Sequence, residues 1–293
     1  MAYTTIDDSE AHFQVKLYAG DSTNHALTFD GDTDMSPDLV WIKERDAAIN
    51  HYAYDSVRGV ADRLQVNIGN AESDTDSTWF QSFDSDGFSI GSEDNINDTG
   101  DNYVAWCWKE SATAGFDIVL YTGNATARTI SHNLSAIPKM IIVKTRSTDD
   151  YNWIVYHGAN TSAPETDAIF LNTTDDTDDD ATYWNDTAPT SSVFTVGTSG
   201  YSNKNTDNML AYVFAEKQGF SKFGSYTGNS DNDGMFVYTG FKPAFVMTKA
   251  SENTSGSNNW FMADNKRHSV APASGGTNFN VIDRQLYANL NNA

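Results

Sequence analysis

The sequence has a single cysteine, Cys107, among 293 residues, so no disulfide can form within the chain. It has no run of 18 apolar residues, which excludes a membrane-spanning helix of the usual length. Basic residues are scarce, because 18 lysines and arginines stand against 40 aspartates and glutamates, a net charge of −22. A chain this acidic is repelled by nucleic-acid backbones and anionic membranes, so neither is expected as a partner.

Catalytic motifs are also missing. The six histidines show no HExxH or paired spacing, and the sequence has no GxSxG, no phosphate-cradling glycine loop and no CxxC. Cys107 lies in an apolar stretch and is expected to be a buried thiol rather than a nucleophile. Carboxylates are numerous enough to supply a glycosidase pair. We nevertheless predict that the chain is not an enzyme.

The chain contains an internal repeat, which is the first feature to seek in a sequence. The clearest copy runs from Tyr121 to Glu216. Its landmarks are Tyr-Thr-Gly-Asn at 121–124, a proline-to-lysine strand at 138–144, Trp-Ile-Val-Tyr-His at 153–157, Phe-Thr-Val-Gly at 194–197 and an aromatic run ending in glutamate at 211–216. Counterparts occur 101–106 residues earlier, at 18–21, 37–45, 88–91 and 103–110. Two recur 105 residues later, at 226–229 and 243–249.

Short runs of β-branched and aromatic residues, separated by glycine, asparagine, aspartate and serine, predict strands and turns throughout. We therefore predict an all-β fold of tandem, jelly-roll-like β-sandwich repeats. The expected core includes Leu39, Val40, Ile42, Ile141, Val143, Val213 and Phe214. The predicted parts are an N-terminal attachment segment at 1–17, whose acidic start does not resemble a signal peptide, and repeats at 18–110, 121–216 and 226–293.

The third repeat lacks counterparts of two landmarks, the Phe-x-x-Gly strand and the aromatic strand ending in glutamate. A sandwich without these strands would expose a sheet edge and part of its core. We expect the natural polypeptide to continue by about the missing length. The alternative is that a neighbouring chain donates the strands.

Lysines recur at one position of the three copies, and arginines follow two residues later in the first two. Residues two apart on a strand face the same side. This pattern predicts a cationic strip for sugar or carboxylate; alternatively, each lysine stem packs on an aromatic ring while its head pairs with an aspartate. Trp184 is a further candidate for stacking on sugar, as are Trp41, Trp153, Trp260, Tyr54 and Tyr156. Tryptophan at matched repeat positions, as at 153 and 260, is however more typical of a core. The candidate ligand-binding residues are Lys43, Arg45, Lys144, Arg146 and Trp184.

Aspartate clusters at 84–87, 175–180 and 231–234 could hold a structural calcium ion through oxygen ligands. None of them has the twelve-residue loop with a closing glutamate. Asp-Gly pairs are also ordinary signals of tight turns. Apart from this calcium ion, no cofactor is expected.

The opening residues 1–8, the run at 37–43, the segment 216–226 and the run Phe-Val-Tyr-Thr-Gly-Phe-Lys-Pro at 236–243 resemble virion structural proteins of marine tailed bacteriophages. The resemblance covers nearly the whole chain and carries no known catalytic or ligand residue. It implies a virion appendage of tail-fibre type, made in the host cytoplasm and exposed on the particle. Residues 1–17 would then bind other virion proteins. The chain would form a homo-oligomer, with a trimer favoured, that presents a host-adhesion surface to glycans. The alternatives are a capsid decoration or head-fibre protein, and a soluble carbohydrate-binding module or glycosidase.

Overall fold

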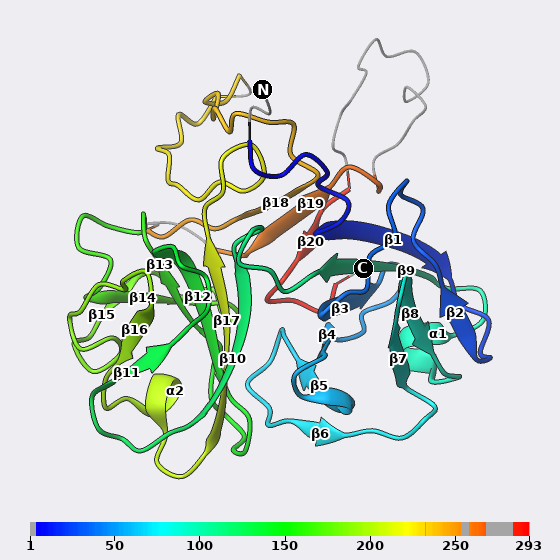
Figure 1. Ribbon diagram of the computed structural model, residues 1–293, viewed down its shortest axis with the longest axis horizontal. Coiled ribbons are helices and arrows are strands. Elements are labelled where there is room, and N and C mark those ends of the chain that lie inside the picture. The colour runs from blue at the N-terminus through cyan, green and yellow to red at the C-terminus, as the bar shows by residue number, and fades with distance from the viewer. Residues whose placement is uncertain (1–3, 232, 253–257, 268–283, 293) are drawn as a thin grey trace.

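The computed structural model describes residues 4–231, 233–252, 258–267 and 284–292. These residues form twenty strands and two four-residue helices, α1 (Asp94–Asn97) and α2 (Gly200–Asn203) (Figure 1). All strand pairs are antiparallel. The predicted all-β class of packed antiparallel sheets is confirmed. No helix in these ranges is long and apolar enough to cross a membrane.

Residues 13–108, called unit 1, form a sandwich of two sheets. The larger sheet has the order β1-β9-β3-β4-β5-β6, and the smaller has the order β2-β8-β7. The strands are β1 (Phe13–Ala19), β2 (His25–Leu27), β3 (Leu39–Glu44), β4 (Tyr52–Asp55), β5 (Gly59–Gln65), β6 (Ser73–Asp74), β7 (Phe80–Asp84), β8 (Gly87–Ile90) and β9 (Asn102–Trp108).

Residues 116–215, called unit 2, repeat this arrangement. Their larger sheet has the order β10-β17-β12-β13-β14-β15, and β11 pairs with β16 in the second layer. The strands are β10 (Phe116–Thr122), β11 (Arg128–Ser131), β12 (Pro138–Thr145), β13 (Ile154–His157), β14 (Asp167–Phe170), β15 (Asp178–Asp179), β16 (Val193–Val196) and β17 (Asn208–Ala215). Lys43 lies opposite Val104 and Lys144 opposite Leu210, which supports the predicted repeat register.

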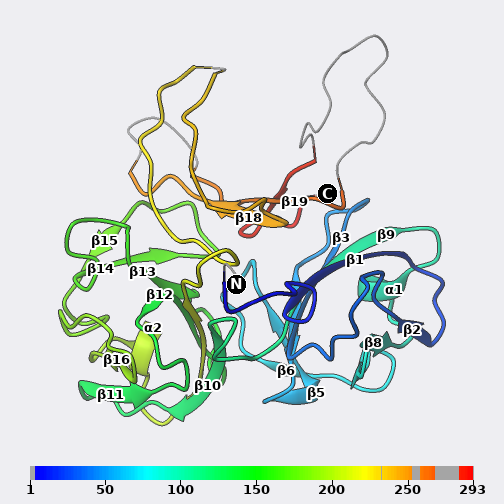
Figure 2. The same cartoon turned by 45° about the horizontal axis from the view of Figure 1, so that its top comes forward.

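Unit 3, comprising the described residues after 220, has one small sheet. Its order is β18 (Phe245–Thr248), β19 (Phe261–Asp264) and β20 (Leu286–Tyr287). These strands correspond to β3-β4-β5 of unit 1 and β12-β13-β14 of unit 2. Figure 2 shows β18 and β19 lying across both larger sandwiches.

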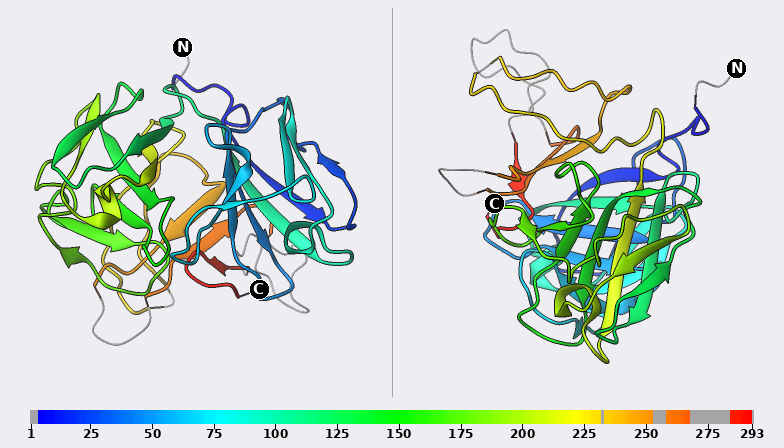
Figure 3. Two further views of the ribbon diagram at one scale, coloured as in Figure 1. Left: turned by 90° about the horizontal axis from the view of Figure 1, so that it is seen from below. Right: turned by 90° about the vertical axis from the view of Figure 1, so that its left-hand side faces the viewer.

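The larger sheets of units 1 and 2 and the sheet of unit 3 share a central apolar core. In β3, Leu39 and Trp41 face this core, whereas Val40 and Ile42 face the interior of unit 1. Strand β12 divides its side chains in the same way between the central core and the interior of unit 2. Unit 3 contributes Trp260 and other residues to the central core. In the left-hand view of Figure 3, the strands of unit 3 lie between units 1 and 2. Strands buried on both faces explain the nearly continuous apolar runs.

Six of the seven predicted core residues are buried, and Phe214 is the exception. Phe214 is half-buried at the margin of the central core, where its ring stacks on Phe116 with centroids 4.7 Å apart. Cys107 is fully buried, as expected, and burial raises the pKa of its thiol.

The predicted attachment segment needs correction. Residues 13–17 belong to β1, which pairs with β9 from Phe13 to Ala19, so they are part of the unit 1 sheet. Strand β10 is their counterpart, and both strands begin with phenylalanine and carry a tyrosine five residues later. The repeat therefore starts earlier than the sequence landmarks indicated. Before β1, the His12 ring lies 6.0 Å from the ring of Phe220, the residue that precedes unit 3.

A buried asparagine motif occurs once in every unit. In each case one asparagine accepts a hydrogen bond from a backbone N–H and donates to the side chain of a second asparagine, over 2.7–2.9 Å. The three sets are Asn67 with Asn50 and His51, Asn172 with Asn152 and Trp153, and Asn289 with Asn259 and Trp260. The same local hydrogen-bonding arrangement is therefore present in unit 3 as in units 1 and 2.

Candidate functional site

The recurring lysines are buried rather than displayed. The side chains of Lys43 and Lys144 are fully buried, and burial lowers the pKa of each, and of Lys249, to about 8. Lys144 donates to the carbonyl oxygens of Gly69 at 3.0 Å and Tyr151 at 2.8 Å, which ties unit 2 to unit 1. Their heads bind backbone carbonyls, so neither the predicted cationic strip nor the predicted pairing with aspartate describes them.

Lys43 and Lys249 show the same chemistry. Lys43 donates to the carbonyls of Glu44 and Ala47, and Lys249 donates to that of Asn258 at 2.5 Å. A lysine in this position satisfies carbonyl groups near the ends of neighbouring strands. The alternation of lysine with apolar residues gave no sign of these partners, because the acceptors are backbone carbonyls, which every residue carries.

Trp184 is a core residue, and its prediction as a sugar-stacking side chain fails. Its side chain is buried in unit 2 and its Nε1 donates to the carbonyl of Asp167 at 3.0 Å. Arg45 is half-buried, and burial together with the nearby charge of Arg267 lowers its pKa. Arg146 lines a surface depression of about 260 Å³ beside Tyr121 and Met209.

The aspartate clusters act in turns. The carboxylate of Asp84 accepts from the hydroxyls of Ser82 and Ser89 at 2.6 and 2.7 Å, and Gly87 completes the turn with φ +108°. Asp178 accepts from the Tyr183 hydroxyl at 2.5 Å. Within the described ranges, no three histidine, cysteine or acidic side chains form a group that could hold a metal ion.

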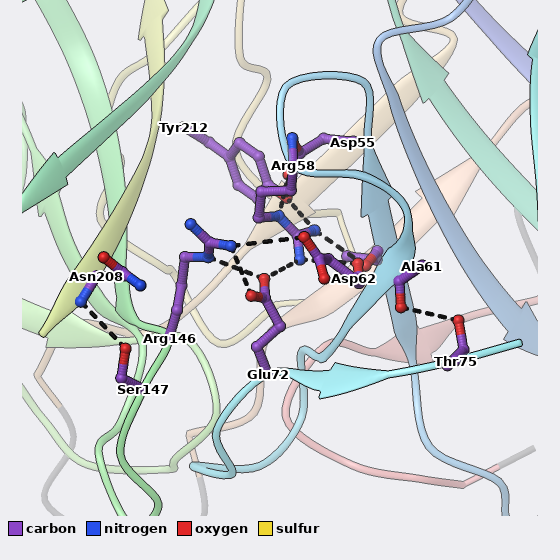
Figure 4. A network of polar contacts seen from close by, with 11 residues as sticks. Asp55, Arg58, Ala61, Asp62, Glu72, Thr75, Arg146, Ser147, Asn208 and Tyr212 are labelled. Atoms are coloured by element: carbon purple, nitrogen blue, oxygen red, sulfur yellow. Dashed lines mark hydrogen bonds and ion pairs between the residues drawn. The ribbon is translucent and has the colours of Figure 1, made fainter.

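The densest ionic network joins unit 1 to unit 2 (Figure 4). Arg58 pairs with Asp55 at 2.5 Å and with Glu72 at 2.7 Å, and Glu72 also pairs with Arg146 of unit 2 at 2.5 Å. The Tyr212 hydroxyl, also from unit 2, donates to Asp55 at 2.8 Å. Burial opposes the charge on Arg58, but its acidic neighbours and Tyr212 raise the pKa of the guanidinium. The network is a buried clamp between units.

A related clamp joins unit 3 to unit 1. Arg267 donates to Asp264 at 2.5 Å, and Asp264 accepts from the Nε1 of Trp106 at 3.0 Å. Trp106 and Tyr212 hold equivalent positions in β9 and β17, opposite Trp41 and Ile142 respectively. In both clamps, an aromatic residue of one unit therefore donates to an aspartate of another unit.

The corresponding position in unit 2 is His157, the last residue of β13. Each clamp needs an aromatic donor from a strand like β9 or β17. Unit 3 has no described counterpart of these strands, so the three units form two clamps instead of three. Here the His157 ring lies 6.3 Å from the Phe223 ring of unit 3, and burial lowers the histidine pKa.

The Tyr-x-Gly-Asx landmark holds each sandwich together at its helix. The Tyr18 hydroxyl donates to the carbonyl of Ile96 at 2.8 Å, and the Tyr121 hydroxyl donates to that of Ser202 at 2.6 Å. A Cβ on Gly123 would lie 1.9 Å from the carbonyl oxygen of Lys204, so the backbone approach requires glycine. Gly20 meets the Asp98 carbonyl at 2.1 Å in the same way.

In unit 3 the same landmark lies on the surface. Tyr226 is 58% exposed, and a Cβ on Gly228 would have nothing within 4 Å. Further along, Phe236 is 86% and Tyr238 73% exposed. We call residues 224–231 and 233–241 the open arm; it projects at the upper left of Figure 1. Exposed apolar side chains gathered on one segment mark an interaction surface.

The open arm and the edge of β18 together form the candidate functional site. Strand β18 pairs only with β19 among the described strands, so its other edge has unpaired backbone groups. Val246 on this strand is 39% exposed. The arrangement is suited to binding a polypeptide segment. The sequence signal that could have located it is the retained Tyr226 and Gly228 without their later landmarks.

Comparison with known proteins gives one family. The family model described as a domain of unknown function, DUF7483, matches residues 8–289. No curated protein and no solved structure matches the chain.

Proposed function

The chain belongs to the DUF7483 domain family. We propose that it is a structural protein of a bacteriophage particle, of tail-fibre type. The observation that carries the proposal is how the chain uses its buried polar groups. The ionic clamps and the buried Lys144 join units to one another. Buried polar groups that join units in this way are suited to a rigid element of an assembly rather than to a reaction centre.

The resemblance to virion proteins of marine tailed phages supports the same proposal. The units in one chain enclose a common core, so a trimer or other homo-oligomer would form through surfaces outside this core. The open arm and β18 edge, and not residues 13–17, are then the better candidates for attachment to another virion protein. The segment before β1 is the part of the predicted attachment region that stays available.

Host-surface glycan binding is a second component of the proposal. The pocket beside Arg146 is the observation in its favour, because a guanidinium can bind the hydroxyls or carboxylates of an acidic sugar. A glycan array with the purified chain tests it. Binding that persists in Arg146→Ala would remove the pocket from consideration.

The main test is to locate the protein on particles. Antibodies raised against the purified chain, coupled to gold, should label the tail appendages of phage particles that encode it. Labelling of the capsid shell would favour the decoration-protein alternative. Unlabelled particles, with the protein found only in the lysate, would overturn the virion proposal, and sugar release by the chain would favour the glycosidase.

A further inference from the structure

We propose that the free edge of β18 and the open arm bind an extended segment of a partner polypeptide, and that this segment resembles residues 193–215 of unit 2. The segment would contribute a strand, a helical turn and a second strand that pairs with β18. This inference deepens the proposed role in an assembly but does not require that the assembly be a virion.

The first argument is the sheet edge. In units 1 and 2, the strands equivalent to β18 pair on this side with β9 and β17 over six or more residues. Those strands in turn pair with β1 and β10 on their other side. In unit 3, the residues equivalent to β10 already reach the central core through Phe223, which packs against it. A segment like β17 would lie between residues 221–226 and β18.

The second argument is the outer face of β18. Val40 and Ile141, the counterparts of Val246, are buried inside their own sandwiches. Val246 lies at the same place in unit 3, where the described residues provide no second layer. The inner face of β18 is already engaged, since the Phe245 ring lies 5.9 Å from those of Phe13 and Trp106.

The third argument is the retained landmark. Tyr226 and Gly228 repeat residues whose counterparts have a definite purpose, to contact the helical turn that precedes the last strand. The amide of Asn203, in that turn, accepts from the backbone N–H of Asn124 at 2.9 Å and donates to the carbonyls of Thr126 and Gly197. Asn97 makes the same contacts in unit 1. The binding segment should therefore carry an asparagine one turn before its strand.

A second copy of this chain does not fit the site. Its only segments of this type precede and include β9 and β17, and both strands lie in the interior of their sheets with a neighbour on each side. Donating either would dismantle a complete sandwich. The proposed donor is a partner polypeptide whose strand places an aromatic side chain beside His157, at the position that Tyr212 and Trp106 occupy in the two existing clamps.

The experiment uses a synthetic peptide of residues 193–216, labelled with a fluorophore and extended by two lysines for solubility. Its binding to the intact chain is measured by fluorescence anisotropy. We expect saturable one-to-one binding, and slower hydrogen exchange at Phe245–Thr248 in the complex. A peptide of scrambled sequence should not bind, and a peptide with Asn203→Leu should bind at least tenfold more weakly.

Two glycine variants of the protein make the test specific. Gly228→Ala should leave the free protein unchanged, because nothing lies within 4 Å of the added methyl group and the glycine φ is not positive. It should weaken peptide binding at least tenfold, since the equivalent methyl at Gly123 would meet a backbone carbonyl. Gly234→Ala, equally open, is the matched control. Absence of saturable binding, or equal binding by Gly228→Ala, would overturn the proposal, whatever particle labelling shows.

Discussion

Replacing Glu72 with alanine tests whether the ionic clamp holds units 1 and 2 together. Glu72 accepts from Arg58 at 2.7 Å and from Arg146 at 2.5 and 2.8 Å. The Arg58 side chain is fully buried and those of Glu72 and Arg146 are 13% exposed. Breaking a buried ion pair costs about 3–5 kcal/mol when a charge is left without compensation. Asp55 still compensates Arg58, so we expect about 3 kcal/mol.

The assay is urea unfolding followed by tryptophan fluorescence, with Glu216→Ala as control. Glu216 pairs with Lys222 at 2.8 Å, but these side chains are 31% and 45% exposed. Such a pair contributes about 0–1 kcal/mol. In a double-mutant cycle, Glu72→Ala and Arg146→Ala should be strongly non-additive. Equal losses for Glu72→Ala and Glu216→Ala, or additive effects in the cycle, would refute the assignment of the clamp.

The effect of Glu72 should also depend on pH. Burial raises the pKa of this carboxyl, but hydrogen bonds from Arg146 and Arg58 outweigh it and leave the pKa below the ordinary value. A carboxylate with a lowered pKa in the folded state stabilises above its unfolded pKa, and this stabilisation is lost as pH falls through the folded value. The difference between wild type and Glu72→Ala should therefore be full at pH 7 and shrink below about pH 4.

Three further outcomes are expected. Burial and the neighbouring Asp117 raise the pKa of Glu110 to about 7. The contribution of this carboxyl to stability is therefore present below about pH 4.5 and is lost as pH rises through 7. Glu110→Gln should flatten the decline in melting temperature between pH 5 and 8, and an unchanged decline would exclude Glu110 as its source. Asn172→Ala, which leaves the Trp153 N–H and the Asn152 amide without their partner, should cost about 1–3 kcal/mol in urea unfolding, whereas Asn70→Ala at an exposed 3.3 Å contact should cost almost nothing. Gly123→Ala should give largely insoluble protein and Gly234→Ala normal yield; equal yields would contradict the close backbone approach.

The sequence predicted much of the fold because repeated strands leave a local signal. The run from Leu39 to Lys43 and its counterpart from Met140 to Lys144 are rich in β-branched or aromatic residues, and both are strands. Phe13 and Phe116 are equivalent residues that begin β1 and β10, but the spacing that marks the repeat in the sequence begins five residues later, at Tyr18 and Tyr121. The N-terminal boundary was therefore misplaced.

The candidate site was less predictable, because its residues are defined by partners distant in the chain. Lys144 reads as an exposed strand residue until the carbonyl of Gly69, 75 residues earlier, is known to lie beside it. A tryptophan such as Trp184 can stack on sugar or fill a core, and the sequence does not show which neighbours surround it in the fold. The retained Gly228 was visible from the start, yet its meaning depends on the contact that Gly123 makes.

The central core has a consequence for synthesis on the ribosome. Its contacts span long stretches of chain: Trp106 binds Asp264 across 158 residues, and the Phe13 ring lies 5.9 Å from that of Phe245. Units 1 and 2 can build their own interiors as they emerge, but each keeps an apolar outer sheet face uncovered until β19 and β20 arrive. Nascent chains that pause between residues 215 and 260 should thus be clients of chaperones that recognise apolar surface.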